Sequence, residues 1–91
     1  MKDENKIVRY TIRNAVFDTL FEMPKNTDFY FTDFLSEVRA RLQANGNNSR
    51  PLDGTIQRAM RLMRRSFTIK CVSNQKSMYR IEEDIFNGNN N

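Results

Sequence analysis

Arginine is the residue type whose spacing in this sequence points most directly to a chemistry. Four arginines follow one another at intervals of three, three and one residues: Arg58, Arg61, Arg64 and Arg65. A guanidinium group can hold the O6 and N7 atoms of guanine with two parallel hydrogen bonds, and it also binds phosphate oxygens. The chemistry indicated is the binding of a polyanion, chiefly nucleic acid or an anionic membrane surface.

The positive charge of the chain is concentrated in one third of its length. Residues 50–80 hold eight Lys and Arg residues against Asp53 alone, a net charge of +7. The whole chain has 15 Lys and Arg against 11 Asp and Glu, a net charge of +4, so the remainder carries −3. Solvated helix faces usually alternate Glu with Lys, and this stretch does not. We therefore favour a polyanion-binding surface over a merely solvated one.

Composition excludes several kinds of catalysis. The sequence has no histidine and a single cysteine, Cys71. A Cys/His zinc site, a disulfide framework, a Ser-His-Asp triad and a Cys-His nucleophile therefore cannot form. The acids are scattered, and the contiguous Glu82-Glu83-Asp84 lies near the chain end without a histidine base. We expect no catalytic residue, no metal site, no cofactor and no small-molecule ligand.

Length and composition favour one small globular domain in the cytoplasm. The chain has 91 residues, of which 38% are hydrophobic and 11% aromatic, enough for a single core. No apolar run approaches the roughly 18 residues of a membrane span, no signal peptide opens the chain, and a lone cysteine fits a reducing compartment. We expect residues 1–84 to form one domain and residues 85–91 a short disordered tail.

Apolar periodicity predicts three helices, at about residues 4–23, 33–44 and 53–66, which position the arginines. Pro24 ends the first helix and Asn45-Gly46 the second. Thr32 or Asp33 is expected to cap the second helix, and Asp53 or Ser49 the third. A short aromatic strand at 29–31 precedes the second helix, with its rings used for packing rather than for base stacking.

Each predicted helix has a buried stripe. On the first helix the stripe consists of Val8, Ile12, Ala15, Val16 and Leu20. On the second it consists of Phe34, Leu35, Val38 and Leu42. On the third, an arc of about 100° holds Ile56, Ala59, Met60 and Met63. An arc of about 60° on the opposite side of this helix holds Arg58, Arg61 and Arg65. The third helix therefore separates a core face from an arginine face.

The first helix has a second apolar stripe, formed by Ile7, Tyr10, Phe17 and Phe21. We expect this helix to be sandwiched in the core. The alternative is a homodimer in which this stripe, together with the C-terminal Ile85 and Phe86, contacts a second copy.

Alternation after the third helix predicts a hairpin, with strands at 67–72 and 77–81 around a turn at 73–76. Phe67, Ile69 and Cys71 are expected to share one face, so that Cys71 is a buried, small apolar side chain. We expect Arg80 to be solvated or paired with Glu82. Arg39 and Arg41 lie near Glu37 in the sequence and are expected to be ordinary surface residues.

The order of these elements resembles the winged helix-turn-helix superfamily over about residues 4–82. The segment Thr55-Ile56-Gln57-Arg58-Ala59-Met60-Arg61-Leu62-Met63-Arg64 is similar to the recognition-helix pattern of bacterial and viral winged-helix regulators, where Thr-Val-x-Arg-x-Leu-Arg-x-Leu is frequent. Met78-Tyr79-Arg80-Ile81 resembles the returning wing strand. The resemblance implies an α+β fold, mostly α, with three helices, a short strand and a C-terminal two-stranded β-hairpin wing.

The same resemblance implies which residues bind DNA. The helix at 53–66 is expected in the major groove, with bases or adjoining phosphates contacted by Thr55, Gln57, Arg58 and Arg61. Phosphate contacts are expected from Arg50, Arg64 and Arg65. The hairpin at residues 67–82 is expected to be the wing. At its tip, Asn74 and Lys76 are expected to contact the DNA backbone or a neighbouring minor groove.

The function expected from this reasoning is sequence-specific or semi-specific binding of double-stranded DNA. Such a chain would be a small transcriptional regulator of bacterial, plasmid or viral type. Two alternatives stay open: a winged-helix module that binds an acidic protein partner, and an RNA or single-strand binder. The first alternative predicts that the chain binds an acidic protein and has no affinity for nucleic acid at low salt. The second predicts that binding is sensitive to substitution of Phe29 or Tyr30.

Overall fold

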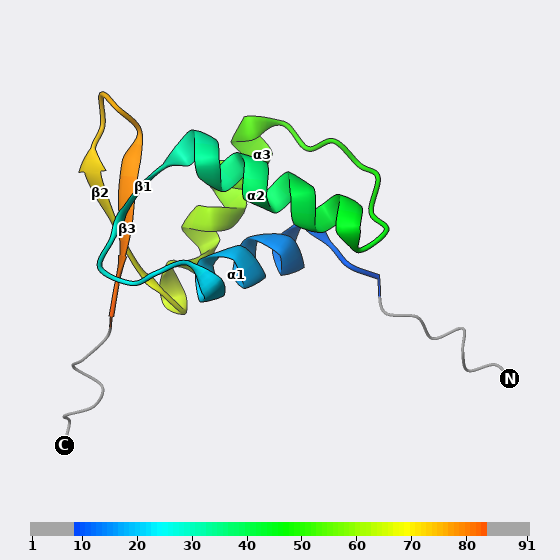
Figure 1. Ribbon diagram of the computed structural model, residues 1–91, viewed down its shortest axis with the longest axis horizontal. Helices are drawn as coiled ribbons and strands as arrows, with labels where there is room; N and C mark the ends of the chain where they lie inside the picture. Colours follow the sequence, from blue (N-terminus) through cyan, green and yellow to red (C-terminus); the bar gives the residue numbers. More distant parts are fainter. Residues whose placement is uncertain (1–8, 84–91) are drawn as a thin grey trace, which may run out of the picture.

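Three amphipathic helices supply the core of the molecule, and a small sheet lies at one end of them (Figure 1). The structure, a computed structural model, describes residues 9–83. In chain order these residues form α1 (Ile12–Glu22), β1 (Asp28–Tyr30), α2 (Phe31–Ala44), α3 (Asp53–Leu62), the single 3₁₀ turn η2 (Met63–Arg65), β2 (Thr68–Ser73) and β3 (Met78–Glu82). The expected α+β class, with three helices and a hairpin, is confirmed.

The predicted apolar stripes of the three helices meet in one core. Its buried apolar side chains are Ala15, Val16, Leu20, Phe34, Leu35, Val38, Leu42, Ile56, Ala59, Met60 and Ile81. Ile12 and Met63 pack half-buried at its edge, and Val8 lies outside the described residues. Because full burial of one large apolar side chain contributes about 1.5–3 kcal/mol, this packing is what holds the helices against one another.

The sheet is antiparallel with strand order β1-β3-β2, so the first strand pairs with the last. Tyr79 lies opposite Phe29 on one side and Cys71 on the other, and Ile81 lies opposite Ile69. Because side chains alternate along a strand, these five residues share one face of the sheet. Ile81 is fully buried there, so this face is the one turned to the helices.

Helix α1 begins later than the sequence analysis predicts. Within the described residues, 9–11 are not helical, and Thr11 is the N-cap. Its hydroxyl accepts a hydrogen bond from the Asn14 backbone N–H (3.1 Å), and its own N–H donates to the Asn14 side-chain oxygen (3.0 Å). This capping box satisfies two donors that a helix start leaves unpaired, and it fixes the start at Ile12.

The predicted caps of α2 and α3 are wrong. Helix α2 begins at Phe31, directly after β1, with Tyr30 as an N-cap that gives no side-chain hydrogen bond. Helix α3 has Leu52 as its N-cap, again without a side-chain bond. Asp53 is the first residue of α3, and its carboxylate instead pairs with an arginine of α2, as described below. Ser49 bonds within the preceding loop, to Asn47.

The end of α2 at Asn45-Gly46 is as predicted. Gly46 has a φ of 82°, in the left-handed region that glycine adopts without a steric penalty. The Asn47 N–H then turns back to the Leu42 carbonyl at 2.8 Å. This closure starts the connection that leads to α3.

The hairpin is shifted by one residue from its predicted bounds, and Cys71 is exposed rather than buried. Cys71 shares a face with Tyr79, but it lies on β2, an edge strand, and the register shifts between Cys71 and Ser73. The edge position and the irregularity leave the thiol uncovered. The other predicted members of this face, Phe67 and Ile69, are half-buried against the core.

The expectation that α1 is sandwiched in the core is also wrong. Phe17 is 39% and Phe21 64% exposed. Tyr10 lies before the helix start, so it does not extend their stripe. Ile7, and the C-terminal Ile85 and Phe86 named with it as a dimer surface, lie outside the described residues. One side of α1 packs on α2 and α3, and the other side is open.

Candidate nucleic-acid interface

Four exposed arginines lie on α3 and on the 3₁₀ turn that follows it: Arg58, Arg61, Arg64 and Arg65. Helix α3 is held from its opposite side, where Ile56 is fully buried and Met60 is 2% exposed. Within residues 9–83 none of the four arginines forms an ion pair. We call these four residues the arginine face. Its guanidinium groups are therefore available to an external anion.

The arginine face changes geometry after Leu62. Helix α3 ends there, and residues 63–65 form the 3₁₀ turn η2, with the Ser66 N–H bonded to the Met63 carbonyl at 2.8 Å. A 3₁₀ turn has 3.0 residues per turn instead of 3.6. Arg58 and Arg61 thus keep the predicted helical spacing, whereas Arg64 and Arg65 follow a tighter spiral than the helical projection assumed.

The start of α3 is tied to α2 by one arginine. The Arg39 Nη2 atom donates to the Asp53 carboxylate at 2.7 Å and to the Pro51 carbonyl at 2.8 Å. Asp53 is the single acid between residues 50 and 80, so this pair neutralises the only negative charge in the basic region. Beside it lies a cavity of about 300 Å³, lined by Arg39, Gln43, Ser49, Arg50 and Pro51.

The other predicted contacts of α3 lie near its start. Arg50 and Thr55 are exposed, and Gln57 is half-buried. Thr55 gives no side-chain hydrogen bond to cap the helix. Of the three residues, Arg50 lines the cavity beside Arg39.

The predicted wing residues lie on a separate element. Residues 74–77 form the turn between β2 and β3, which lies at one end of the molecule, apart from α3 (Figure 1). Asn74 and Lys76 are both exposed in this turn. The Lys76 N–H donates to the Ser73 hydroxyl at 3.3 Å, and Ser77 has a φ of 49°. The arginine face on α3 and η2 is thus separate from the turn that carries Asn74 and Lys76.

Two cations counted in the basic third of the chain are compensated by acids on the sheet. Arg80 donates to Asp28 at 2.8 Å, and its guanidinium lies 3.7 Å from Glu82. Lys70 lies 3.7 Å from the same Glu82 carboxylate. The hydrogen bond to Asp28 raises the pKa of Arg80 above its ordinary value. The expected pairing of Arg80 with Glu82 is confirmed. The pairing with Asp28, which lies 52 residues away in the sequence, was not predicted.

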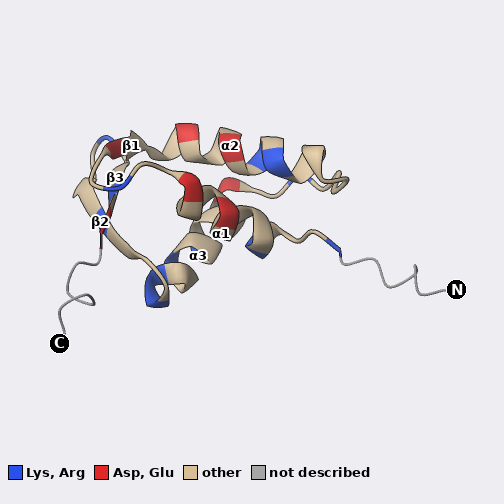
Figure 2. Cartoon of the chain, turned by 60° about the horizontal axis from the view of Figure 1, so that its bottom comes forward, with Lys and Arg blue, Asp and Glu red and all other residues tan. Residues whose placement is uncertain are grey.

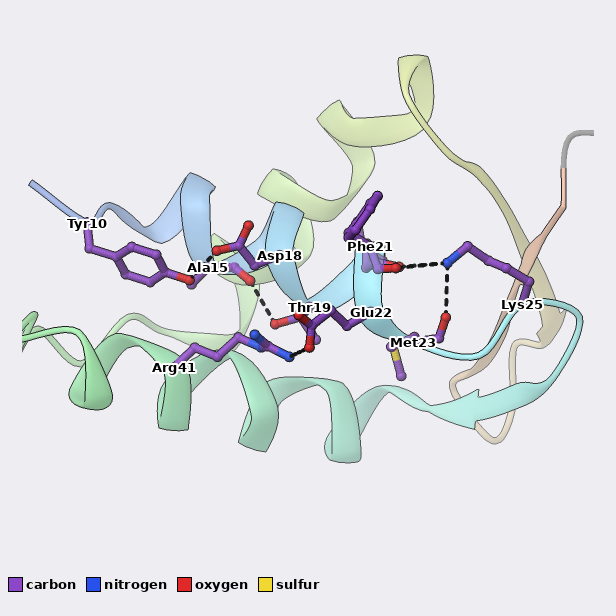
Figure 3. Close-up of polar contacts among 10 residues, drawn as sticks. Tyr10, Ala15, Asp18, Thr19, Phe21, Glu22, Met23, Lys25 and Arg41 are labelled. Carbon is purple, nitrogen blue, oxygen red and sulfur yellow. Dashed lines mark hydrogen bonds and ion pairs between the residues drawn. The ribbon is translucent and has the colours of Figure 1, made fainter. Parts of the chain in front are cut away.

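Half of the acids of the described residues lie on α1 and α2, away from the arginines at the end of α3 (Figure 2). There Arg41 donates to Glu22 at 2.9 Å, and Tyr10 donates its hydroxyl to Asp18 at 2.8 Å (Figure 3). Burial and the hydrogen bond to Asp18 raise the pKa of Tyr10 to about 12. Arg41 thus pairs with α1, and Arg39 with α3, rather than with the neighbouring Glu37.

Two further observations concern other kinds of site. Among residues 9–83, no three His, Cys, Asp or Glu side chains are grouped as metal ligands. No helix in this part of the chain is long and apolar enough to cross a membrane.

Comparison with protein-family models, with curated proteins and with solved structures gives no match. The function proposed below therefore rests on the residues and their arrangement.

Proposed function

We propose that this chain is a winged helix-turn-helix protein that binds double-stranded DNA through the arginine face. The observation that carries the proposal is that four arginines are exposed and without an ion pair among residues 9–83, two on α3, whose opposite side is buried, and two on the 3₁₀ turn that follows it. The element order, with β1 added to a C-terminal hairpin, resembles the same superfamily. We propose no catalytic activity.

Helix α3 has suitable dimensions for this role. Its ten residues span about 15 Å, and the major groove is about 12 Å wide. With α3 in the groove, Arg58 reaches base edges from the middle of the helix and Arg61 from its last turn. Thr55 and Gln57 lie in the N-terminal half of α3, which is where recognition helices usually contact bases.

Some of the remaining cations are proposed to bind phosphates, and others are assigned no part in DNA binding. Arg64 and Arg65 on η2, and Arg50 before α3, are proposed to hold phosphates, which fix register without reading sequence. Lys76 and Asn74 in the hairpin turn are proposed to contact the backbone beside the groove. Lys70 and Arg80 already have carboxylate partners, so we assign them no part in binding.

The biological role proposed is that of a small cytoplasmic regulator of transcription, with sequence-specific or semi-specific binding. Each well-placed bidentate arginine–guanine pair discriminates by about 1–3 kcal/mol, so Arg58 and Arg61 suffice for modest specificity. Two-fold pairing of the chain would then favour half-sites about one DNA turn apart.

Base stacking by the aromatic segment is not favoured. The Phe29 ring lies 5.9 Å from that of Phe34 and 6.2 Å from that of Tyr79, and the Phe31 ring lies 5.9 Å from that of Tyr79. Of the three consecutive aromatics, only Tyr30 is substantially exposed, at 46%. A single exposed ring does not make a platform for successive bases.

A binding isotherm tests the proposal. Fluorescence anisotropy with a duplex of about 20 base pairs is measured over a salt series for the natural chain, for Arg58→Ala/Arg61→Ala and for Arg13→Ala/Lys70→Ala. Both variants lose two positive charges, but only the first loses them from the arginine face. We expect affinity to fall steeply with salt and the first variant alone to bind weakly.

Two results would contradict the proposal. Equal weakening in both variants would mean that net charge, not the arginine face, governs binding. Absence of binding near about 50 mM salt would redirect the search to an acidic protein partner.

A further inference from the structure

An exposed aromatic surface on α1 has no role in the proposed DNA contact. The rings of Phe17 and Phe21 stack with centroids 6.3 Å apart and planes 10° apart. Phe17 also packs on Phe67, just before β2, with centroids 5.2 Å apart. We call the exposed rings of Phe17 and Phe21, together with the half-buried ring of Phe67, the aromatic surface. Exposed phenylalanines grouped in this way usually mark a place where another segment binds.

A fixed positive charge borders the aromatic surface. The Lys25 Nζ atom donates to the carbonyls of Phe21 and Met23, both at 3.0 Å, and lies 6.0 Å from the centre of the Phe21 ring (Figure 3). Within residues 9–83 Lys25 forms no ion pair. An apolar surface with a cation held at its edge fits a segment that is both apolar and acidic.

The end of β3 lies beside the loop that carries Lys25, and the residues that follow β3 are both acidic and apolar. The Asn26 N–H donates to the Ile81 carbonyl at 2.7 Å, and the Asn26 side-chain oxygen accepts from the Glu83 N–H at 3.2 Å. Glu83 is therefore held against the residue that follows Lys25. The sequence continues Asp84-Ile85-Phe86. Three extended residues span about 10 Å, and they start from Glu83, which is hydrogen-bonded to the residue after Lys25.

We propose that residues 84–86 bind the aromatic surface of their own chain. Ile85 and Phe86 pack on Phe17 and Phe21, and the carboxylate of Asp84 pairs with Lys25, which has no ion-pair partner among residues 9–83. A second copy is a poorer occupant, because two such surfaces would bring two lysines together without an acid between them. The covalent connection also gives the chain's own segment a high effective concentration at this surface.

Nuclear Overhauser effects on the full chain test this proposal directly, without nucleic acid. With the Ile δ-methyl groups labelled, we expect cross-peaks between Ile85 and the rings of Phe21 and Phe17. Absence of these cross-peaks overturns the proposal. In a mixture of labelled and unlabelled chains, cross-peaks seen between different molecules would assign the segment to a second copy and overturn it as well.

A double-mutant cycle supplies an independent readout. The urea midpoint is measured for Phe21→Ser, for Ile85→Ser/Phe86→Ser and for the combination. We expect each change to lower the midpoint and the combination to lower it no further than the larger of the two, because both remove one contact. Leu62→Ser, which alters a side chain of similar exposure (57%) on α3, is the control and is expected to be additive with the tail changes. Additive effects of Phe21→Ser and the tail changes would overturn the proposal.

Discussion

Arg39 on α2 and Asp53 on α3 form an ion pair 2.7 Å long across the connection that separates their helices. The same guanidinium nitrogen donates to the Pro51 carbonyl at 2.8 Å. One side chain thus fixes both the end of the connection and the first residue of α3. Because Asp53 is the only acid in the basic third of the chain, the pair also keeps the field around α3 positive.

We expect Arg39→Ala to reduce both stability and DNA affinity. An exposed ion pair contributes roughly 0.2–1 kcal/mol and a hydrogen bond to a carbonyl about 1 kcal/mol, so the free energy of unfolding falls by about 1–2 kcal/mol. DNA binding weakens because Asp53 regains its uncompensated charge. Urea unfolding and anisotropy measure the two effects. Arg39→Ala/Asp53→Asn should recover affinity, and failure to do so would contradict this role for the pair.

Substitutions on α3 and on η2 should separate base reading from phosphate binding. Arg58→Ala is expected to cost about 1–3 kcal/mol on a preferred site and to relax specificity there. Arg64→Ala is expected to weaken binding to all duplexes alike and to lower the salt slope by about one. Competition between a selected site and a random duplex makes the comparison. An equal loss of discrimination in both variants would contradict the assignment.

The two faces of α3 should respond differently to truncation. Met60 is 2% exposed, and Met60→Ala is expected to lower the free energy of unfolding by about 2–5 kcal/mol through lost burial and a cavity. Leu62 is 57% exposed, and Leu62→Ala is expected to change stability by less than about 0.5 kcal/mol. Urea midpoints measure both; a costly Leu62→Ala would show that a surface we describe as open is covered.

Capping offers a matched pair of threonines. Thr11→Ala removes the capping box of α1 and is expected to cost about 1 kcal/mol. Thr32→Ala should cost little, because α2 begins at Phe31 and has no side-chain cap. Helix content by circular dichroism and thermal midpoints test the difference. A larger loss of stability in Thr32→Ala than in Thr11→Ala would contradict the assignment and would show that Thr32 caps the second helix.

Alkaline pH should loosen the N-terminal side of the core. The pKa of Tyr10 is raised from 10.0 to about 12 by burial and by its hydrogen bond to Asp18. The stability contributed by the protonated phenol is therefore complete below pH 10 and is lost as pH rises through about 12. Urea unfolding at increasing alkalinity measures this loss. Tyr10→Phe should show a smaller one, and an unchanged profile would contradict the assignment.

Much of the fold could be predicted because apolar periodicity reports burial directly. Phe34, Val38 and Leu42 recur at helical spacing and are buried as expected. The same spacing on α3 placed its arginines on the exposed side. Local rules were weaker at helix starts: Thr32 and Asp53 are favourable caps in isolation, but a strand runs directly into α2, and Arg39 takes the carboxylate of Asp53.

The features that sequence reasoning missed depend on residues brought together by the tertiary fold. Arg80 and Asp28 are 52 residues apart and meet only because β1 pairs with β3. Cys71 has the alternation of a buried strand residue, and only the strand order shows that it lies on an edge. Of the candidate site, the exposed arginines were therefore predictable, whereas the compensation of Lys70 and Arg80 was not.

The uneven placement of charges on the helices gives the molecule an electric dipole. Helices α1 and α2 carry four acids against three arginines, whereas residues 53–65 carry four arginines against one acid. In the field of a polyanion a torque acts on such a molecule before any contact forms, and it turns the end of α3 towards the negative charge. If the proposed function holds, random encounters with DNA become oriented ones, so the segregation of acids from arginines raises the rate of productive collision as well as the strength of the final contact.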